Sequence, residues 1–328
     1  YKEAMAMIMR VMYLLTFGVL YTLSLLPLRI LYLLSDVLCL LAYRVVGYRR
    51  RLVRQHLRDS FPGRTDRQLA AIEHGFYAWF CDYIVETVKL FSMSPRQMRR
   101  RMVFKGTDKL SEAVDRGQSC GVFLGHFCNW EWITSLPLWV SPKGQCTQIY
   151  HPLENPEFDK IFLGLRSRFG GVSIPMAETL RRIAAYRAHK QPIIMGYISD
   201  QIPFWNNIHH WLTFLNHDTP VLTGSEKIIR ATGQATFYAD VRRIRRGYYE
   251  CTFVPMTMHP EETHEWQLTD QYFSLLEASI RRQPECYLWT HNRWKRTHEE
   301  YNLRLDPKTG RVNITDSIED IKRRKGLL

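Results

Sequence analysis

From about residue 103 onward, short β-type runs alternate with helical stretches along the chain. The predicted strands are 119–125, 145–150, 192–198, 234–242 and 248–255. The predicted helices are 131–139, 156–169, 176–189, 220–232 and 268–282. This alternation is typical of a largely parallel sheet covered by helices, because consecutive parallel strands need a crossover connection. The sequence therefore predicts an α/β fold whose strand ends are available for a functional site.

The segment before this alternation, residues 46–100, is predicted to be helical and contains two carboxylates, Asp82 and Glu86, one turn apart. Acids at this spacing share one face of a helix. They could bind a metal ion, but more often one acid caps or pairs with a cation and the other is solvated. We expect the second arrangement.

The amino-terminal stretch 11–28 (VMYLLTFGVLYTLSLLPL) carries no charge. As a helix it would be about 27 Å long, which is the lower limit for crossing a bilayer. A second apolar stretch, Ile30 to Tyr43, is interrupted by Asp36. We expect residues 1–45 to anchor the chain in a membrane as a helix or helical hairpin, either spanning or lying in the interface. The alternative is a buried hairpin of a soluble protein; a cleaved signal peptide is not favoured, because no small-residue cleavage site precedes the basic segment.

The basic residues are unevenly distributed, and the formal net charge is +13. Lys2 and Arg10 flank the apolar stretch on one side, and six arginines follow it: Arg44, Arg49, Arg50, Arg51, Arg54 and Arg58. By the positive-inside rule this asymmetry keeps the bulk of the chain in the cytoplasm. Basic surfaces attract nucleic acid, anionic lipid or an acidic carrier protein. Because no helix-turn-helix, RRM or zinc-finger pattern is present, we favour lipid and expect no nucleic-acid partner.

The seven cysteines are scattered, without a CxxC pair or a Cys/His cluster at metal spacing. This pattern favours a reducing compartment and argues against a structural zinc site. Cys128 lacks the electropositive neighbours that a reactive thiolate needs, so we do not expect it to act as a nucleophile.

A histidine and a carboxylate stand together where the first predicted core strand ends, in GHFCNWEW (125–132). Imidazole titrates near neutral pH, so His126 could take a proton from an attacking hydroxyl or amine. A carboxylate on its other nitrogen, here Glu131, would fix the tautomer as the acid of a catalytic triad does. Read without further context, a satisfied structural histidine is the more common explanation.

Several blocks in order resemble one family. GVFLGHFCNWEW is similar to the His-x4-Asp/Glu block of the glycerophosphate-type acyltransferases, and most similar to the late lipid A biosynthesis acyltransferases, which transfer lauroyl or myristoyl chains. RRRLVRQHLRDSFP resembles the basic segment that follows that family's anchor. The blocks IYHPLENPEFDKIFLGLRSRFG, ISDQIP and PECYLWTHNRWK agree as well. The resemblance covers roughly residues 10–298. It implies an anchor over 1–45, an α/β acyltransferase domain over 46–300 and a basic tail over 301–328.

The resemblance also implies roles for individual residues. The catalytic base falls on His126 and the acid that orients it on Glu131. Substrate-binding positions fall on Asn129, Arg166, Arg168, Asp200 and Gln201. The chain departs from the pattern at Tyr150-His151-Pro152, where members that act on lipid A often have Tyr-Arg-Pro. This departure weakens the assignment of the acceptor but not that of the reaction class.

By this resemblance the chain is an acyltransferase on the cytoplasmic face of a bacterial inner membrane. The expected donor is an acyl carrier protein or coenzyme A thioester, and the acceptor is a hydroxyl or amine of an anionic lipid. No metal or prosthetic cofactor is implied. Two alternatives stay open at this point: a non-catalytic lipid or carrier binding protein of the same fold, and a hydrolase that releases fatty acid from the thioester. Acceptor identity, acyl length and oligomeric state are not determined by the sequence.

Overall fold

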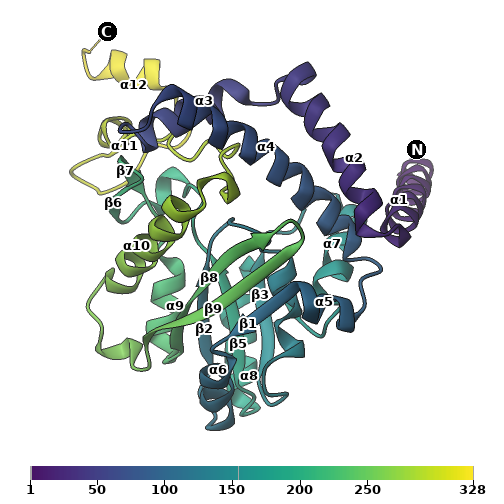
Figure 1. Cartoon of the computed structure of the whole chain (residues 1–328). Coiled ribbons are helices and arrows are strands. Elements are labelled where there is room, and N and C mark those ends of the chain that lie inside the picture. The colour runs from purple at the N-terminus through teal and green to yellow at the C-terminus, as the bar shows by residue number, and fades with distance from the viewer. Residues whose placement is uncertain (1, 154, 328) are drawn as a thin grey trace.

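A seven-stranded sheet forms the centre of the chain in a computed structural model that describes residues 2–153 and 155–327 (Figure 1). The strand order is β1-β9-β8-β2-β5-β3-β4. The strands are β1 (Met102–Lys105), β2 (Cys120–Leu124), β3 (Gln145–Tyr150), β4 (Val172–Pro175), β5 (Ile193–Ile198), β8 (Ala235–Arg245) and β9 (Tyr248–Thr257). Neighbouring strands run parallel except β8 and β9, which form an antiparallel pair. The predicted α/β class and all five predicted strands are confirmed, and the short strands β1 and β4 are additional.

The two central strands set the position of everything that follows them. Every residue of β2 is buried, as expected for a parallel strand covered on both faces. Its register with β5 pairs Leu124 with Ile198. The residues just beyond these two, in separate parts of the sequence, therefore leave the sheet side by side at the same edge.

Helices cover the sheet on both faces. They are α6 (Thr107–Asp115), α7 (Pro156–Ser167), α8 (Thr179–Ala188), α9 (Gly224–Thr232) and α10 (Gln267–Arg282). The last four agree with predicted helices within a few residues, whereas α6 was not predicted. The predicted helix 131–139 is instead a 3₁₀ segment, Trp132–Leu138, which contains Pro137. A proline in this position donates no main-chain hydrogen bond, which favours a short, irregular turn over an α-helix.

The predicted helical part, 46–100, contains α3 (Arg50–Ser60), α4 (Asp66–Lys89) and α5 (Pro95–Arg101). Helix α4 begins with a capping box formed by Thr65 and Gln68, which satisfies main-chain donors at its start. It crosses the upper end of the sheet (Figure 1). There its residues contact the segment that follows β2, so α4 forms part of the floor of the candidate site.

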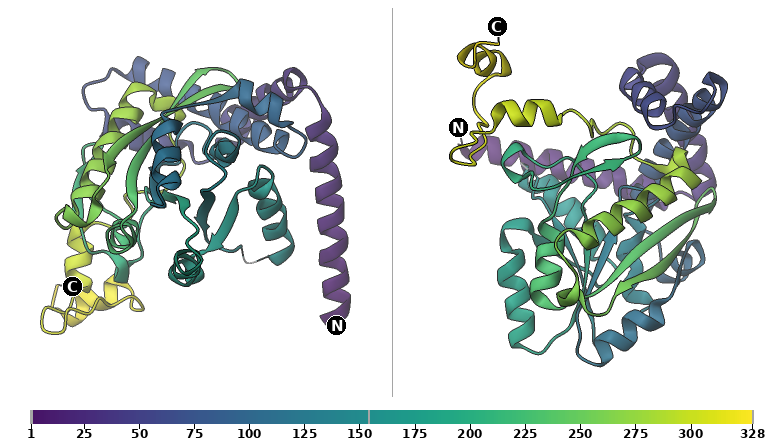
Figure 2. Two further views of the ribbon diagram at one scale, coloured as in Figure 1. Left: turned by 90° about the horizontal axis from the view of Figure 1, so that it is seen from below. Right: turned by 90° about the vertical axis from the view of Figure 1, so that its left-hand side faces the viewer.

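The amino-terminal part consists of α1 (Lys2–Leu25) and α2 (Leu28–Leu40), followed by a π-helical turn, Leu41–Val46. The helical conformation is interrupted between the two helices at Pro27, and α1 lies beside the rest of the molecule (Figure 2). Among the described residues, no single helix meets the length and apolarity of a membrane span, whereas the pair Arg10–Leu25 and Leu28–Val46, bent by 118°, meets them together.

Much of this pair is exposed and apolar, including Leu15, Val19, Leu33, Val37 and Val46. The inner face of α2 packs against α4 instead and carries the buried residues Leu28, Leu31 and Ser35. Helix α2 is therefore both part of the packed fold and the carrier of an uncovered apolar face.

The remaining elements lie towards the carboxyl terminus. A hairpin of β6 (Trp211–Phe214) and β7 (His217–Pro220) precedes α9, and α11 (His298–Arg304) and α12 (Ile318–Arg324) follow the last sheet strand and α10. The expected basic tail, 301–328, contains α12 and most of α11, and its far end projects from the body of the molecule (Figure 2).

Candidate active site

His126 and Asp200 form the centre of the site. His126 follows β2 and Asp200 follows β5, and the pairing of these strands brings them together. Nδ1 of the imidazole lies 2.7 Å from Asp200 Oδ1, and the main-chain N–H of His126 donates to Oδ2 at 3.0 Å. The Asp200 side chain is 2 % exposed and that of His126 is 19 % exposed. The ring is thus fixed from behind by a buried carboxylate while its other edge stays accessible.

Burial alone would raise the pKa of Asp200, but the imidazole of His126, its two hydrogen bonds and the charge of Arg293 together lower the pKa below the usual aspartate value. An ionised Asp200 accepts hydrogen bonds and cannot donate one. It therefore requires a proton on Nδ1 of the neutral ring, which leaves the lone pair on Nε2. That tautomer is the one a general base needs.

Gln201 lies on the accessible side of the same ring. Its Nε2 is 3.3 Å from His126 Nε2. An amide N–H in this position donates to the nitrogen that would accept a substrate proton, so Gln201 supports the same tautomer and must give way when a hydroxyl binds. Trp130 packs edge-on against the imidazole at 5.2 Å between ring centroids and limits its rotation.

Glu131 does not make the contact with the imidazole that the sequence suggested. Both of its carboxylate oxygens are taken by Arg166 of α7, with Nε–Oε2 at 3.0 Å and Nη2–Oε1 at 2.6 Å. The expectation that Glu131 orients His126 is corrected here: the acid on Nδ1 is Asp200. The cause is the parallel pairing of β2 with β5, which places Asp200 beside Nδ1 of His126, so this position is already occupied by a carboxylate.

The pair of Glu131 and Arg166 is bidentate and largely shielded. The Glu131 side chain is 5 % exposed and that of Arg166 is 26 % exposed. Burial opposes the charge on Arg166, but the hydrogen bonds and charge of Glu131 raise its pKa overall. A planar guanidinium held in this way keeps one nitrogen, Nη1, for a further acceptor.

Asn129 and Arg168 do not line the site. Asn129 is fully buried; its Nδ2 donates to Glu86 at 2.7 Å and its Oδ1 accepts from the main-chain N–H of Trp132. Arg168 lies beyond the end of α7 and donates to the main-chain carbonyls of Phe91 and Met93. Both side chains hold loops in place through these hydrogen bonds, and their expected contacts with substrate stay predictions.

Two residues of the block PECYLWTHNRWK (284–295), called the closing segment from here on, belong to the surroundings of the site, and sequence reasoning did not single them out. His291 Nε2 accepts from the main-chain N–H of Ile202, and burial lowers the pKa of His291 to about 4, so this ring is neutral near pH 7. Arg293 is 1 % exposed and donates to the carbonyl of Pro220 at 2.8 Å. The signal that could have found them is their place in a block shared with the resembled family.

Two other residues weighed from the sequence lie outside the chemistry. Cys128 is fully buried and burial raises the pKa of its thiol well above the usual value, which agrees with the expectation that it is not a nucleophile. His151 is exposed, and its Nδ1 lies 2.9 Å from the neighbouring carbonyl of Pro152.

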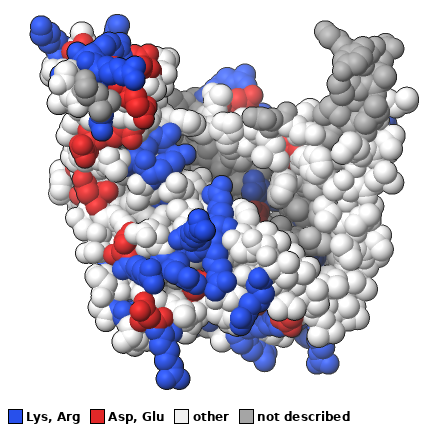
Figure 3. Space-filling model, turned by 90° about the horizontal axis from the view of Figure 1, so that it is seen from above, with Lys and Arg blue, Asp and Glu red and all other residues white. Residues whose placement is uncertain are grey.

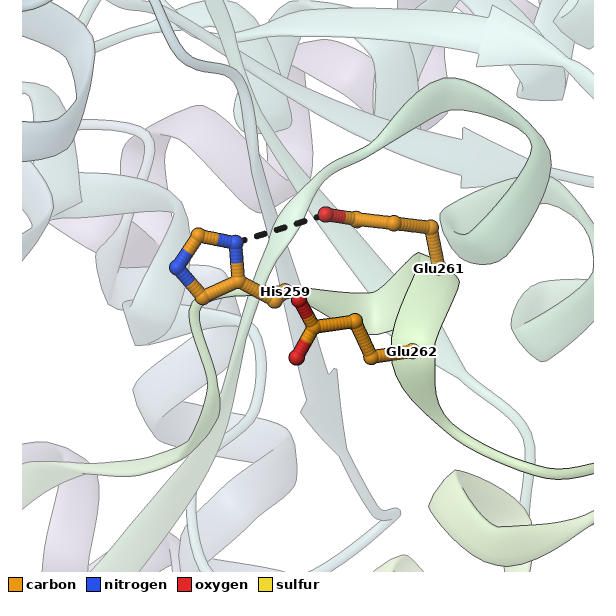
Figure 4. A group of neighbouring side chains, drawn as sticks. All are labelled: His259, Glu261 and Glu262. Atoms are coloured by element: carbon orange, nitrogen blue, oxygen red, sulfur yellow. Dashed lines mark hydrogen bonds and ion pairs between the residues drawn. The ribbon is translucent and has the colours of Figure 1, made fainter.

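An exposed group of possible metal ligands lies after β9. His259, Glu261 and Glu262 bring ligand-type atoms within 4.8 Å of one another, and His259 Nδ1 is 3.3 Å from Glu261 (Figure 4). All three side chains are solvated, and carboxylates gathered on a surface need no metal ion. We assign no site to them.

Basic side chains gather on the face seen in Figure 3. An open groove of about 760 Å³ at the start of α3 is lined by Gly47, Arg49, Arg50, Arg51, Leu52, Arg54, Gln55 and Arg58. Arg50 and Arg54 are paired with the buried Glu73 at 2.8 and 2.9 Å. Arg49 donates to the carbonyl of Thr290 in the closing segment at 2.8 Å, so this basic groove borders the segment that also packs behind the site.

The chain matches the family described as bacterial lipid A biosynthesis acyltransferases over residues 2–296. No curated protein matches it significantly. The family match includes β2, β5 and α7, which carry or lead into His126, Asp200 and Arg166, and it extends from the first helix to the closing segment. With nine-tenths of the sequence covered, the chain belongs to the bacterial lipid A biosynthesis acyltransferase family and is an acyltransferase.

Proposed function

We propose that this acyltransferase moves a fatty acyl chain from a thioester donor to a hydroxyl or amine of an anionic lipid A precursor or related lipid, with His126 as general base and Asp200 as the acid that orients it. The observation that supports this most directly is the imidazole itself: Nδ1 is held by a buried carboxylate at 2.7 Å and Nε2 faces the accessible side. No serine or cysteine nucleophile is required, since the attacking group belongs to the acceptor.

The proposed reaction has two steps, addition of the acceptor to the thioester and collapse of the tetrahedral intermediate. Nε2 of His126 takes the proton of the acceptor hydroxyl as its oxygen attacks the thioester carbonyl carbon, and the imidazolium that forms is stabilised by the charge of Asp200. Collapse of the tetrahedral intermediate breaks the carbon–sulfur bond. The departing thiolate takes the proton back from Nε2, which returns the free base.

The hydrogen-bond donors that stabilise the oxyanion of the tetrahedral intermediate must be N–H groups that do not already donate to another acceptor. The main-chain N–H groups of His126, Phe127 and Cys128 donate to Asp200, Gly125 and Cys286, and that of Trp132 donates to Asn129. These contacts exclude four main-chain donors and leave the N–H groups of residues 129–131, at the start of the 3₁₀ segment, for which no hydrogen bond is formed within the described part of the chain. Arg166 also has an uncommitted donor, because its Nη1 makes no hydrogen bond within the described part of the chain.

We assign Arg166 to the phosphate of the acceptor rather than to the oxyanion. Glu131 holds its guanidinium rigidly, and a planar fork binds phosphate better than a point charge does. Glu131 would then serve the reaction through Arg166. The basic groove along α3 suits either an acidic carrier protein or anionic headgroups, and the uncovered apolar face of α1 and α2 supports attachment to the cytoplasmic side of a bacterial inner membrane.

The test uses the full chain purified in detergent, with acyl carrier protein thioester and acyl-CoA as alternative donors. Lipid A precursor and a lysophospholipid serve as alternative acceptors, and acylated lipid is measured by mass spectrometry. We expect acyl transfer that His126→Gln reduces at least about a thousandfold. The matched control is His189→Gln, an exposed histidine on the surface after α8 whose Nδ1 contacts only Ala185 in its own turn.

Two outcomes would overturn the proposal. Equal rates of acyl transfer by His126→Gln and the parent would show that His126 is not the general base. Release of free fatty acid as the main product even with acceptor present would show a hydrolase, with water in place of the lipid.

A further inference from the structure

Helix α4 carries two buried carboxylates, and they are satisfied in different ways. Asp82 is 2 % exposed and Glu86 is fully buried, so the expectation that one of the two is solvated was wrong. Asp82 binds two cations, Arg243 and Arg246, each at 2.6 Å. Glu86 has no Lys or Arg within hydrogen-bonding distance among the described residues.

Three neutral donors from three separate elements converge on Glu86 instead. Its Oε2 accepts from Asn129 Nδ2 at 2.7 Å and from the Tyr249 hydroxyl of β9 at 2.8 Å. Its Oε1 accepts from the Tyr32 hydroxyl of α2 at 2.9 Å. An acid buried without a cation is costly to maintain, and an apolar residue of the same size would stabilise the core better. A carboxylate here is explained by what it fixes rather than by stability.

What Glu86 fixes is the segment between His126 and Glu131. Asn129 lies between those two residues, and its Oδ1 accepts from the main-chain N–H of Trp132 at 3.0 Å. The Trp132 indole N–H also donates to the main-chain carbonyl of Glu86 at 3.1 Å. Glu86 therefore holds the segment at residues 129 and 132, which flank Glu131.

The segment also needs to be held. Cys128 has a φ of +52°, a left-handed conformation that a residue with a side chain adopts only when its surroundings enforce it. Upstream, the main-chain N–H of His126 is fixed by Asp200. Downstream, the Asn129 amide and the Trp132 indole N–H both donate to Glu86. Loss of these would let the segment relax and would move Glu131 relative to His126.

We propose that Glu86 is a positioning residue for acyl transfer: through Asn129 and Trp132 it fixes Glu131, and with it Arg166, at a set place relative to His126. This inference rests on the proposed function. It assigns no substrate contact to Glu86, which is too deeply buried for one.

The test compares Glu86→Ala with Glu86→Gln in the full chain, by kcat/KM for the acceptor at saturating donor and by thermal unfolding. A glutamine can keep its oxygen towards Asn129 and Tyr249 and turn its amide towards Tyr32, whose hydroxyl can accept as well as donate. We expect Glu86→Ala to lose about tenfold in kcat/KM, mainly through a higher acceptor KM, and Glu86→Gln to stay within about threefold of the parent.

Two further variants separate positioning from general damage to the fold. Asn129→Ala, which leaves Glu86 with both tyrosines, should reproduce the loss of kcat/KM for the acceptor, and the double variant should add little, because the two residues act as one unit. Asp82→Ala is the matched control, one turn away on the same helix: it should lower the melting temperature but keep kcat/KM.

Several results would overturn the inference. These are a folded Glu86→Ala or Asn129→Ala enzyme with kcat/KM for the acceptor within threefold of the parent, a loss in Glu86→Gln as large as in Glu86→Ala, or an equal loss in Asp82→Ala. If Glu86→Ala does not fold, Asn129→Ala decides the question alone. Inactivity of the parent towards every acceptor would instead count against the proposed function.

Discussion

Replacing Asp200 by asparagine tests which acid serves the catalytic histidine. The substitution keeps the size of the side chain and removes its charge. Asparagine has two ways to sit in the pocket. With its oxygen towards the imidazole, its NH₂ group would face the main-chain N–H of His126, which now donates at 3.0 Å, and two donors would oppose each other.

The opposite orientation satisfies both groups and is therefore favoured, since a buried main-chain N–H without a partner costs about 1–3 kcal/mol. In that orientation the amide donates to Nδ1, so the ring proton moves to Nε2 and the base is lost. The imidazolium also loses its counter-charge. By analogy with triads in which the same exchange reverses the tautomer, we expect kcat to fall about 10³- to 10⁴-fold, or about 4 to 5 kcal/mol of transition-state stabilisation.

The assay is single-turnover acyl transfer at saturating acceptor, so that the chemical step is observed. Asp200 is too buried to contact substrate, so acceptor KM should change little. Glu131→Gln is the partner measurement: it weakens the grip on Arg166 and should raise acceptor KM about tenfold with a smaller effect on kcat. The reverse pattern, with kcat nearly intact in Asp200→Asn and lost in Glu131→Gln, would refute the assignment of Asp200 and restore Glu131 as the orienting acid.

Four further predictions follow from the same structure. Arg166→Lys should raise acceptor KM about tenfold with kcat largely kept, because an ammonium cannot hold Glu131 with two parallel bonds and still present a fixed donor to the phosphate. Steady-state kinetics that match the parent would remove this residue from the site. Deleting residues 1–16 should lower the fraction that sediments with membranes in high salt without changing the melting temperature, and unchanged sedimentation would place the attachment elsewhere. In Gly125→Ala the new methyl group would lie 2.7 Å from the buried Leu276 Cδ1, so we expect a loss of about 1–3 kcal/mol by denaturant unfolding, and a neutral effect would mean that Leu276 moves freely. Burial raises the pKa of Glu86 from 4.5 to about 7, so between these pH values the folded chain keeps a proton that the unfolded chain releases, and the free energy of unfolding falls as pH rises. Glu86→Gln should remove this fall, so its free energy of unfolding should gain up to about 3 kcal/mol relative to the parent between pH 5 and pH 8. A difference between the two proteins that does not change with pH would contradict the raised pKa.

Local patterns in the sequence were sufficient for the elements of the fold. The period of apolar residues and the turn signals between them predicted β2 and β5 to within a residue or two, because backbone conformation and burial of one strand leave a local trace. The strands β1 and β4 have only four residues each, which is too short for a recognisable pattern of apolar residues. His126, Arg166 and Asp200 were predicted as site residues because the short blocks that contain them resemble one family.

The partner of each side chain was decided only by the tertiary structure. Glu131 is five positions from His126 and Asp200 is 74 positions away, yet the imidazole contacts Asp200. The order of strands in the sheet causes this, and strand order depends on long-range packing that no local pattern records.

The same reason separates residues that look alike in the sequence. Arg166 and Arg168 are two positions apart, but Arg166 is the last arginine within α7 and points to Glu131, whereas Arg168 lies past its end and binds carbonyls. Asp82 and Glu86 share a helix face, but only the surrounding elements supply cations to one and neutral donors to the other. The sequence determined which groups the site can use; packing determined which of them meet, because a hydrogen bond is set by ångströms in space and not by separation along the chain.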